Sequence, residues 1–165
     1  ALDYMMGNRT PYRDAALRGA LMGLTLGHTR ADVYAAAIDS IALGSANVLS
    51  VLKARGVSVG RVMMAGGIVK NAAWLQATVD AIGQPVEVAR EDNLSLVGTA
   101  AAAAAAIGAF ADLASAAAAC VAPSKALLPD PARAEWFDRM LPLYQDATER
   151  LRPVLHQLAD RQREA

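Results

Sequence analysis

The residues best suited to bind a ligand lie in the segment 64–71, Met-Ala-Gly-Gly-Ile-Val-Lys-Asn, between a short apolar run and a helical pattern. The adjacent glycines Gly66 and Gly67 let the backbone turn sharply and approach a ligand, because no Cβ intervenes. The helix start that follows offers free N–H groups and a positive dipole end, which suit a nucleotide. Asn71 could read a ribose or an adenine edge with its donor and acceptor. The alternative is that the glycines only form a turn and Asn71 caps the helix.

Other polar residues are weaker candidates. Asp39 could be a site carboxylate or a solvated residue in the middle of a helix. The adjacent Glu91 and Asp92 are more typical of helix capping than of catalysis. Lys70 could lie near a phosphate or simply be solvated. Structural roles are expected for three further residues. Arg18 should form a surface salt bridge, and His28 should lie in an exposed turn. Cys120 should be buried and inert at a helix end.

The first part of the chain predicts a loop, a strand and a long helix. The apolar run 19–26 is expected to form a buried strand. Thr29 and Asp32 have the spacing of a capping box, which predicts a helix start. Apolar residues then recur every three or four positions and predict the buried face of this helix: Val33, Ala37, Ile41, Ser45, Val48 and Leu52. A positive last turn and Gly56 indicate its end.

The rest of the chain continues the alternation of strand and helix. The expected order is a strand over 61–65, a helix over 71–82, a strand over 85–89, an alanine helix to 108, a short helix over 112–120, a proline-rich loop with Pro123, Pro129 and Pro131, and a helix over 132–161 kinked or broken at Pro142 and Pro153. Trp136, Phe137 and Tyr144 are predicted to pack in the core or in an interface. The alternation indicates a layered α/β domain with right-handed crossovers.

Composition excludes several classes of function. The chain has 165 residues, and its 16 basic and 16 acidic side chains balance. Zero net charge argues against nucleic-acid binding and against electrostatic docking to an anionic membrane. One cysteine and two distant histidines leave no disulfide and no local metal motif, which favours the reducing cytoplasm. The chain has 38 alanines, and many of them lie in the stretch 94–121. This composition predicts a closely packed helix rather than a membrane span.

Several motifs together resemble one family. The pattern Gly19–Leu24, Asp32-Val33 and Ala36–Asp39 resembles the second signature of the FGGY carbohydrate kinases. The run 7–19 is similar to that of xylulokinase-like members, and Gly66-Gly67…Lys70-Asn71…Trp74-Leu75-Gln76 resembles the family's adenosine motif. Further similar stretches are 83–88, 95–100 and 141–144.

This resemblance implies a fold and a reaction. The family has two actin-like, ribonuclease-H-like domains, with ATP mostly on the second and sugar mostly on the first, and it phosphorylates a sugar or polyol with MgATP. The resemblance makes Gly66, Gly67 and Asn71 the adenosine contacts, with Ile68 and Lys70 beside them in the same loop. Ile68 departs from the family, which commonly has a small residue after the two glycines.

The resemblance also sets expectations for the whole protein. Residues 1–165 should form most of a C-terminal nucleotide-binding domain, with the sugar-binding domain, the catalytic aspartate, the phosphate motifs and the Mg²⁺ contacts outside this chain. We therefore expect these residues alone to be inactive and to expose apolar surface. A xylulose-like pentulose is the favoured substrate. ATP and ADP are the expected partners, and a homodimer is compatible with the resemblance. The alternatives are a non-catalytic scaffold or assembly module and another ATPase of the same superfamily.

Overall fold

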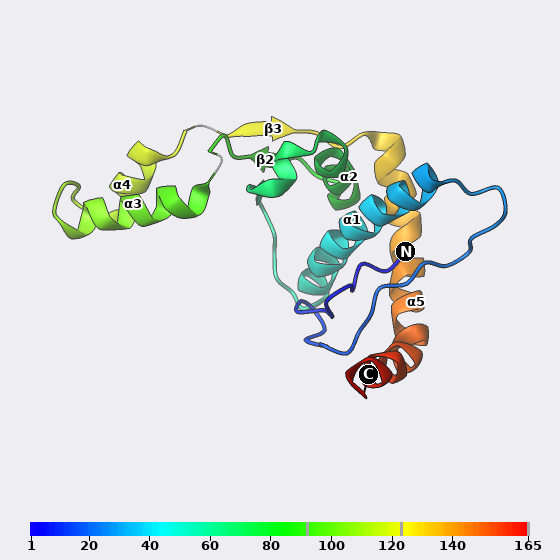
Figure 1. Cartoon of the computed structure of the whole chain (residues 1–165). Coiled ribbons are helices and arrows are strands. Elements are labelled where there is room, and N and C mark those ends of the chain that lie inside the picture. The colour runs from blue at the N-terminus through cyan, green and yellow to red at the C-terminus, as the bar shows by residue number, and fades with distance from the viewer. Residues whose placement is uncertain (92, 123, 165) are drawn as a thin grey trace.

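The computed structural model describes residues 1–91, 93–122 and 124–164. Figure 1 shows a group of helices joined to a small sheet, with a helical hairpin that projects from the far side of that sheet. The elements, in chain order, are α1 (Arg30–Ala54), β1 (Val62–Met64), the 3-10 turn η1 (Gly67–Lys70), α2 (Ala72–Ile82), β2 (Val86–Val88), α3 (Leu94–Ala106), α4 (Leu113–Cys120), β3 (Lys125–Leu127) and α5 (Pro131–Glu164).

The sheet is mixed, with the strand order β1-β2-β3. Strand β1 pairs with β2 in parallel, and β2 pairs with β3 in antiparallel orientation. Glu87 of the central strand accepts hydrogen bonds from Arg61, which precedes β1, and from the hydroxyl of Ser124, which precedes β3. Its carboxylate therefore connects β2 to the starts of both neighbouring strands. These bonds, the one from Arg61 first, lower the pKa of Glu87 to about 2. The strands expected over 61–65 and 85–89 are confirmed, although β1 is only half-buried.

Strand β3 lies where the sequence predicted only a proline-rich loop. Its three residues fall between prolines, and the pattern Lys-Ala-Leu carries no strand signal of its own. The strand forms because β2 offers it an edge, with Glu87 opposite Ala126. Pro123 lies outside the described residues, and Pro131 begins α5.

Helix α1 begins at the predicted capping box. The Thr29 hydroxyl accepts from the Asp32 N–H, and the Asp32 carboxylate accepts from the Thr29 N–H at 2.7 Å. The expected buried face is wrong, because Ile41 is exposed and the deeply buried residues are Ser40, Ala42, Leu43, Ala46 and Asn47. The helix is rich in small and apolar residues all round, so its neighbours rather than its periodicity decide which face is covered.

The core lies where α1, α2 and α5 meet the N-terminal segment. Its members, apart from alanines, are Leu2, Tyr4, Leu17, Leu43, Phe137, Tyr144 and Leu155. Phe137 and Tyr144 are buried, and Trp136 packs against them, as the sequence predicted. The Tyr4 hydroxyl pairs with the Thr148 hydroxyl at 3.1 Å, so these two polar groups of the core satisfy each other.

Helix α5 continues through both of its internal prolines, Pro142 and Pro153. Each proline removes one backbone donor, and its ring crowds the preceding turn. Figure 1 shows the ribbon changing direction toward the C-terminus, so α5 is kinked and not broken. Its long buried face, from Phe137 to Ala159, stabilises the helix despite the missing hydrogen bonds.

The run 19–26 does not form the buried strand that its composition predicts. It is an irregular, exposed segment, and its only pairing among the described residues is the bridge between Ala20 and Leu2. Gly23 has φ +74°, which is not a strand conformation. A strand needs a neighbour on its edge, and the described chain supplies one at a single residue.

Helices α3 and α4 form the projecting hairpin of Figure 1 and pack mainly on each other. Ala101 and Ala116 are their buried residues, as expected for helices that approach closely through alanine. Their caps are Asn93 and Asp112, each of which accepts from a backbone N–H three residues on.

Of the described helices, α1 has the length and apolar composition of a membrane span. It packs on α2 and α5, as core helices with such sequences also do.

Candidate nucleotide-binding site

The segment 64–71, called the candidate loop below, leaves the sheet at the carboxyl end of β1. Strand β2 ends at the same edge, because the two strands are parallel, and the Ala89 N–H bonds to the Met64 carbonyl at 2.9 Å to extend the pairing. Ligands of open α/β sheets collect beyond such strand ends. The loop therefore lies at the edge of the sheet where a bound ligand is expected.

The backbone at the two glycines is turned and open. Gly66 has φ +82°, which a side chain would disfavour, so glycine is needed there for conformation. A Cβ at Gly66 or at Gly67 would meet nothing within 4 Å. The glycines therefore leave room above the backbone that no neighbouring group fills, which is the space that a ligand in close contact would need.

The 3-10 turn η1 connects the glycines to α2. The Val69 N–H bonds to the Gly66 carbonyl at 3.2 Å, and the Asn71 N–H bonds to the Ile68 carbonyl at 3.1 Å. Ile68 is half-buried, and Lys70 is exposed at the end of the turn. Because the turn closes its own hydrogen bonds, the loop has a defined shape without a ligand.

Asn71 is the N-cap of α2. Its Oδ1 accepts from the Trp74 N–H at 3.1 Å, which is the capping alternative that the sequence left open. The cap does not use the Nδ2 amide, which keeps two donors beside the positive end of the helix dipole. Capping and ligand binding are therefore compatible at Asn71. The far end of α2 is equally well defined, with Gly83 in the left-handed conformation at φ +67°.

The neighbouring carboxylates have mainly structural contacts. Glu91 follows β2, and its Oε1 accepts from the Ala122 N–H, so it braces the base of the α3–α4 hairpin instead of capping α3. The cap is Asn93, and Asp92 lies outside the described residues. The described residues include no group of three or more His, Cys, Asp or Glu side chains that could hold a metal ion.

A hollow of about 480 Å³ lies between α1, α2 and the start of α5. Asp39 projects into it from α1 and forms a 2.7 Å ion pair with Arg133 of α5. Burial raises the pKa of Asp39, although the Arg133 charge and hydrogen bond act in the opposite direction. On the α2 side, the buried Asp80 carboxylate accepts from Gln76 Nε2 at 2.7 Å and from the Asp130 N–H at 2.8 Å.

Sequence reasoning found Asp39 but not its partner. The two residues of this pair are 94 positions apart, and no local pattern relates them. The structure does not bring Asp39 into the loop at Gly66. Asp39 is therefore half-buried and paired, neither solvated nor part of the candidate site.

The other expectations have mixed outcomes. Arg18 makes hydrogen bonds to Gln162 and to the carbonyls of Ala15 and Leu17 in place of the expected salt bridge. His28 lies in an exposed turn as predicted, with its Nδ1 accepting from the Thr25 N–H at 2.9 Å. Cys120 is exposed and not buried, because α4 covers α3 through Ala116 and leaves its last residue free of that contact.

Comparison with known proteins gives the family. The sequence profile of the FGGY family of carbohydrate kinases, C-terminal domain, matches residues 1–107. The human FGGY carbohydrate kinase domain-containing protein is 30% identical over 152 residues, which make up 90% of this chain and 28% of that protein. Ribulokinase from Mycolicibacterium smegmatis is 34% identical over 113 residues, covering 68% of this chain and 20% of that enzyme.

Solved structures give the fold. Xylulose kinase from Rhodospirillum rubrum matches with a TM-score of 0.75 and 29% identity, over 94% of this chain and 31% of that one. Ligand-bound xylulose kinase from Lactobacillus acidophilus has a TM-score of 0.83 at 24% identity, over 95% and 32% of the two chains. The expected fold class, an actin-like ATPase α/β domain with helices packed on a mixed sheet, is confirmed.

The chain spans about a third or less of the length of these relatives. The profile match nevertheless covers well over half of this chain, from its first residue to the tip of the α3–α4 hairpin. Its motifs, its profile match and its fold agree, and the chain belongs to the FGGY family of carbohydrate kinases.

Proposed function

We propose that this chain supplies the adenosine-binding part of a kinase that phosphorylates a sugar or polyol with ATP. The observation that carries the proposal is the open backbone at Gly66 and Gly67, placed between the carboxyl end of β1 and the start of α2. A flat base or ribose could lie against this backbone without meeting a side chain. Asn71, already fixed by its cap, would donate from Nδ2 to the nucleoside.

The remaining loop residues would complete the contact. Ile68 would contribute apolar surface beside the base, and Lys70 would favour the negative charge of the nucleotide. The loop has no carboxylate cluster, so Mg²⁺ would be held by the phosphates of ATP and by residues outside this chain. MgATP supplies the transferable phosphoryl group, whereas the residues of this chain bind and orient the nucleoside end.

The proposal extends to the whole protein. Residues 1–165 would form most of a C-terminal nucleotide-binding domain, and an N-terminal domain would bind the sugar and carry the catalytic aspartate. The relatives include ribulokinases, a xylulose kinase and glycerol kinases. The run 7–19 favours a xylulose-like pentulose among these substrates. Consumption of ATP and sugar suits a cytoplasmic enzyme, and a homodimer fits the proposal.

An NMR titration tests the nucleotide site. ATP added to the chain should shift the amide signals of Gly66, Gly67 and Asn71. Gly67→Val fills the open space without a clash in the free protein, so it should fold and yet bind ATP at least tenfold more weakly. Gly60→Val is the matched control, since Gly60 also has open space but lies before β1, away from the loop.

Two outcomes would contradict the proposal. Equal ATP affinity of the two variants would move the site away from the loop. No binding of ATP at millimolar concentration would favour the non-catalytic scaffold that the sequence also allowed. The same chain, given MgATP and a panel of pentuloses and polyols, should show no phosphorylation, because the proposed catalytic aspartate is not among its residues.

A further inference from the structure

Residues 7–15 fold into a closed loop that the proposed nucleotide site does not use. Asn8 and Asp14 exchange both of their backbone hydrogen bonds, each at 2.8 Å, and so join the two sides of the loop. Gly7 permits this closure, because its φ is +75° and a Cβ there would lie 2.8 Å from the Ala15 Cα. This part of the run 7–19 is therefore a defined structural unit, called the arginine loop below.

The arginine loop is attached to two helices. Asn8 Oδ1 accepts from the Tyr12 N–H at 2.9 Å, and the Tyr12 hydroxyl accepts from Asn47 Nδ2 of α1 at 3.0 Å. Asp14 Oδ2 pairs with His156 Nε2 of α5 at 2.8 Å. Asp14 is the only acidic residue in the sequence of the loop, and its carboxylate is therefore engaged with α5.

The two arginines of this loop, Arg9 and Arg13, are exposed and unpaired. Within residues 1–91, 93–122 and 124–164, neither guanidinium group forms a hydrogen bond, an ion pair or a ring contact. Arg13 has φ +52°, in the left-handed region that residues with a side chain rarely adopt. Such a conformation persists only where the surrounding structure holds it. The loop therefore presents two free guanidinium groups on a backbone that its other contacts hold in place.

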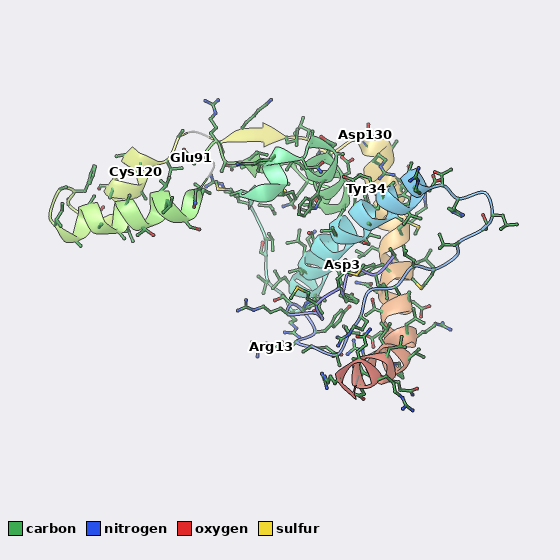
Figure 2. All side chains as sticks on the ribbon, in the orientation of Figure 1. Asp3, Arg13, Tyr34, Glu91, Cys120 and Asp130 are labelled. Atoms are coloured by element: carbon green, nitrogen blue, oxygen red, sulfur yellow. The ribbon has the colours of Figure 1, made fainter. Side chains whose placement is uncertain are left out.

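A hollow of about 530 Å³ lies beside these arginines. Its lining residues are Met6, Asn8, Arg9, Thr10, Arg13 and Ala15. None of these residues is acidic, although acidic and basic side chains balance over the whole chain. The lining does supply further donors, in the Asn8 amide and the Thr10 hydroxyl. Figure 2 labels Arg13 at the outer edge of the N-terminal segment, far along α1 from Tyr34. The hollow is therefore a local concentration of positive charge and hydrogen-bond donors.

We propose that this hollow binds the phosphate group of a small anion, either free phosphate or a phosphate ester. Each arginine presents a planar fork of N–H donors that matches two phosphate oxygens, and it stays charged at any physiological pH. Asn8 Nδ2 and the Thr10 hydroxyl would donate to the remaining oxygens. The site shares no residue with the candidate loop at Gly66, so the inference does not rest on nucleotide binding.

NMR titration of the full chain tests the site. Inorganic phosphate and a pentulose 5-phosphate are added separately at constant ionic strength, and each should give saturable shifts of the Arg9 and Arg13 guanidinium Nε signals. Arg13→Asn removes the charge but tolerates the left-handed backbone, so the loop should keep its shape while phosphate binds about tenfold more weakly or worse.

Two further variants complete the test. Arg9→Gln changes an arginine outside the left-handed region and should weaken phosphate binding to a similar extent, with no effect on the backbone of Arg13. Arg30→Gln is the matched control, because Arg30 is also an exposed arginine but begins α1, away from the hollow. It should bind phosphate as the wild type does.

The two probes distinguish the sources of the phosphate group. Tighter binding of the pentulose phosphate would identify an ester as the ligand, and equal or tighter binding of inorganic phosphate would identify the free ion; either result supports the site. Shifts that sodium chloride reproduces at the same ionic strength would overturn it. Phosphate affinity that Arg9→Gln and Arg13→Asn leave unchanged would also overturn it.

ATP separates this site from the proposed function. If Gly67→Val abolishes the phosphate shifts at Arg9 and Arg13 together with the ATP shifts at the candidate loop, the arginines belong to the nucleotide site and the separate phosphate site is refuted. If Gly67→Val leaves phosphate binding intact, the separate site is supported. A chain that binds phosphate at the arginines and no ATP at the candidate loop would support the site while contradicting the proposed function.

Discussion

Tyr144 of α5 donates a hydrogen bond of 2.6 Å to the carboxylate of Asp3, which lies against Gly44 of α1. The two bonded residues are 141 positions apart, and the Tyr4 ring lies 6.0 Å from the Tyr144 ring beside them. Figure 2 labels Asp3 where the N-terminal segment passes α1. This one carboxylate therefore joins the N-terminal segment to two helices, and its environment should govern how tightly the segment is held.

Gly44→Ala should destabilise the protein. A Cβ at this position would lie 2.7 Å from Asp3 Oδ2, and the Tyr144 hydrogen bond prevents the carboxylate from moving freely. The usual gain of about 1 kcal/mol from Gly to Ala inside a helix should be outweighed by overpacking of about 1–3 kcal/mol. Urea unfolding measures the result. The control is Gly98→Ala in α3, which meets nothing within 4 Å and should stabilise; equal gains in both variants would exclude the predicted clash.

Asp3→Asn should make stability less dependent on pH. Burial raises the pKa of Asp3 above its usual value, against the lowering effect of the Tyr144 hydrogen bond. A raised folded-state pKa means that folding disfavours the charged form, so this cost is present at pH 7 and disappears as the pH falls below the unfolded value. The advantage of D3N over the wild type should therefore shrink between pH 7 and pH 4. Urea unfolding at several pH values measures this advantage, and the exposed Asp138→Asn is the control. A difference in the free energy of unfolding between D3N and the wild type that stays constant with pH would contradict the expectation.

Asn71→Ser should separate capping from ligand binding. Serine also accepts from the backbone of the first turn, so the free energy of unfolding should change by less than about 0.5 kcal/mol. It lacks the Nδ2 amide, so ATP affinity should fall about tenfold. Asn71→Ala should lose both, including about 1 kcal/mol of cap energy. Calorimetric titration and thermal unfolding measure the two effects, and unchanged ATP affinity in the serine variant would leave Asn71 as a cap only.

Arg133→Met should raise the pKa of Asp39 further. Burial already raises this pKa, and the charge and hydrogen bond of Arg133 are the two largest influences that lower it, and the substitution removes both. Carboxyl ¹³C chemical shifts followed against pH measure this value. The control is Arg139→Met, which breaks a pair with Glu135 on the same helix and should leave Asp39 unchanged. An unmoved Asp39 pKa after Arg133→Met would show that the pair has little influence.

Local signals in the sequence predicted the elements near the site correctly. The capping box at Thr29 and Asp32, the cap at Asn71 and the glycine stop at Gly83 each depend on residues within four positions. The loop at Gly66 also follows its strand as expected. Such features form independently of the rest of the fold, because both partners of each contact lie within the same short segment.

The errors concern features that depend on distant partners. Strand β3 formed without a strand pattern because β2 offered an edge, whereas residues 19–26 had the pattern and lacked a neighbour. The pairing of Asp39 with Arg133 and of Asp3 with Tyr144 joins segments more than ninety positions apart. Hydrophobic pattern does not encode these contacts, which arise only when the helices pack.

Helix α5 has a consequence for how the domain can be divided. The family profile ends at residue 107, yet Phe137, Tyr144 and Leu155 of α5 fill the core around Leu2 and Tyr4. The part of the chain that the family profile matches therefore lacks the helix whose side chains complete its core. A truncation after residue 107 would leave this core open to water, and we expect such a piece to collapse without cooperative unfolding, whereas the chain through α5 unfolds in one transition.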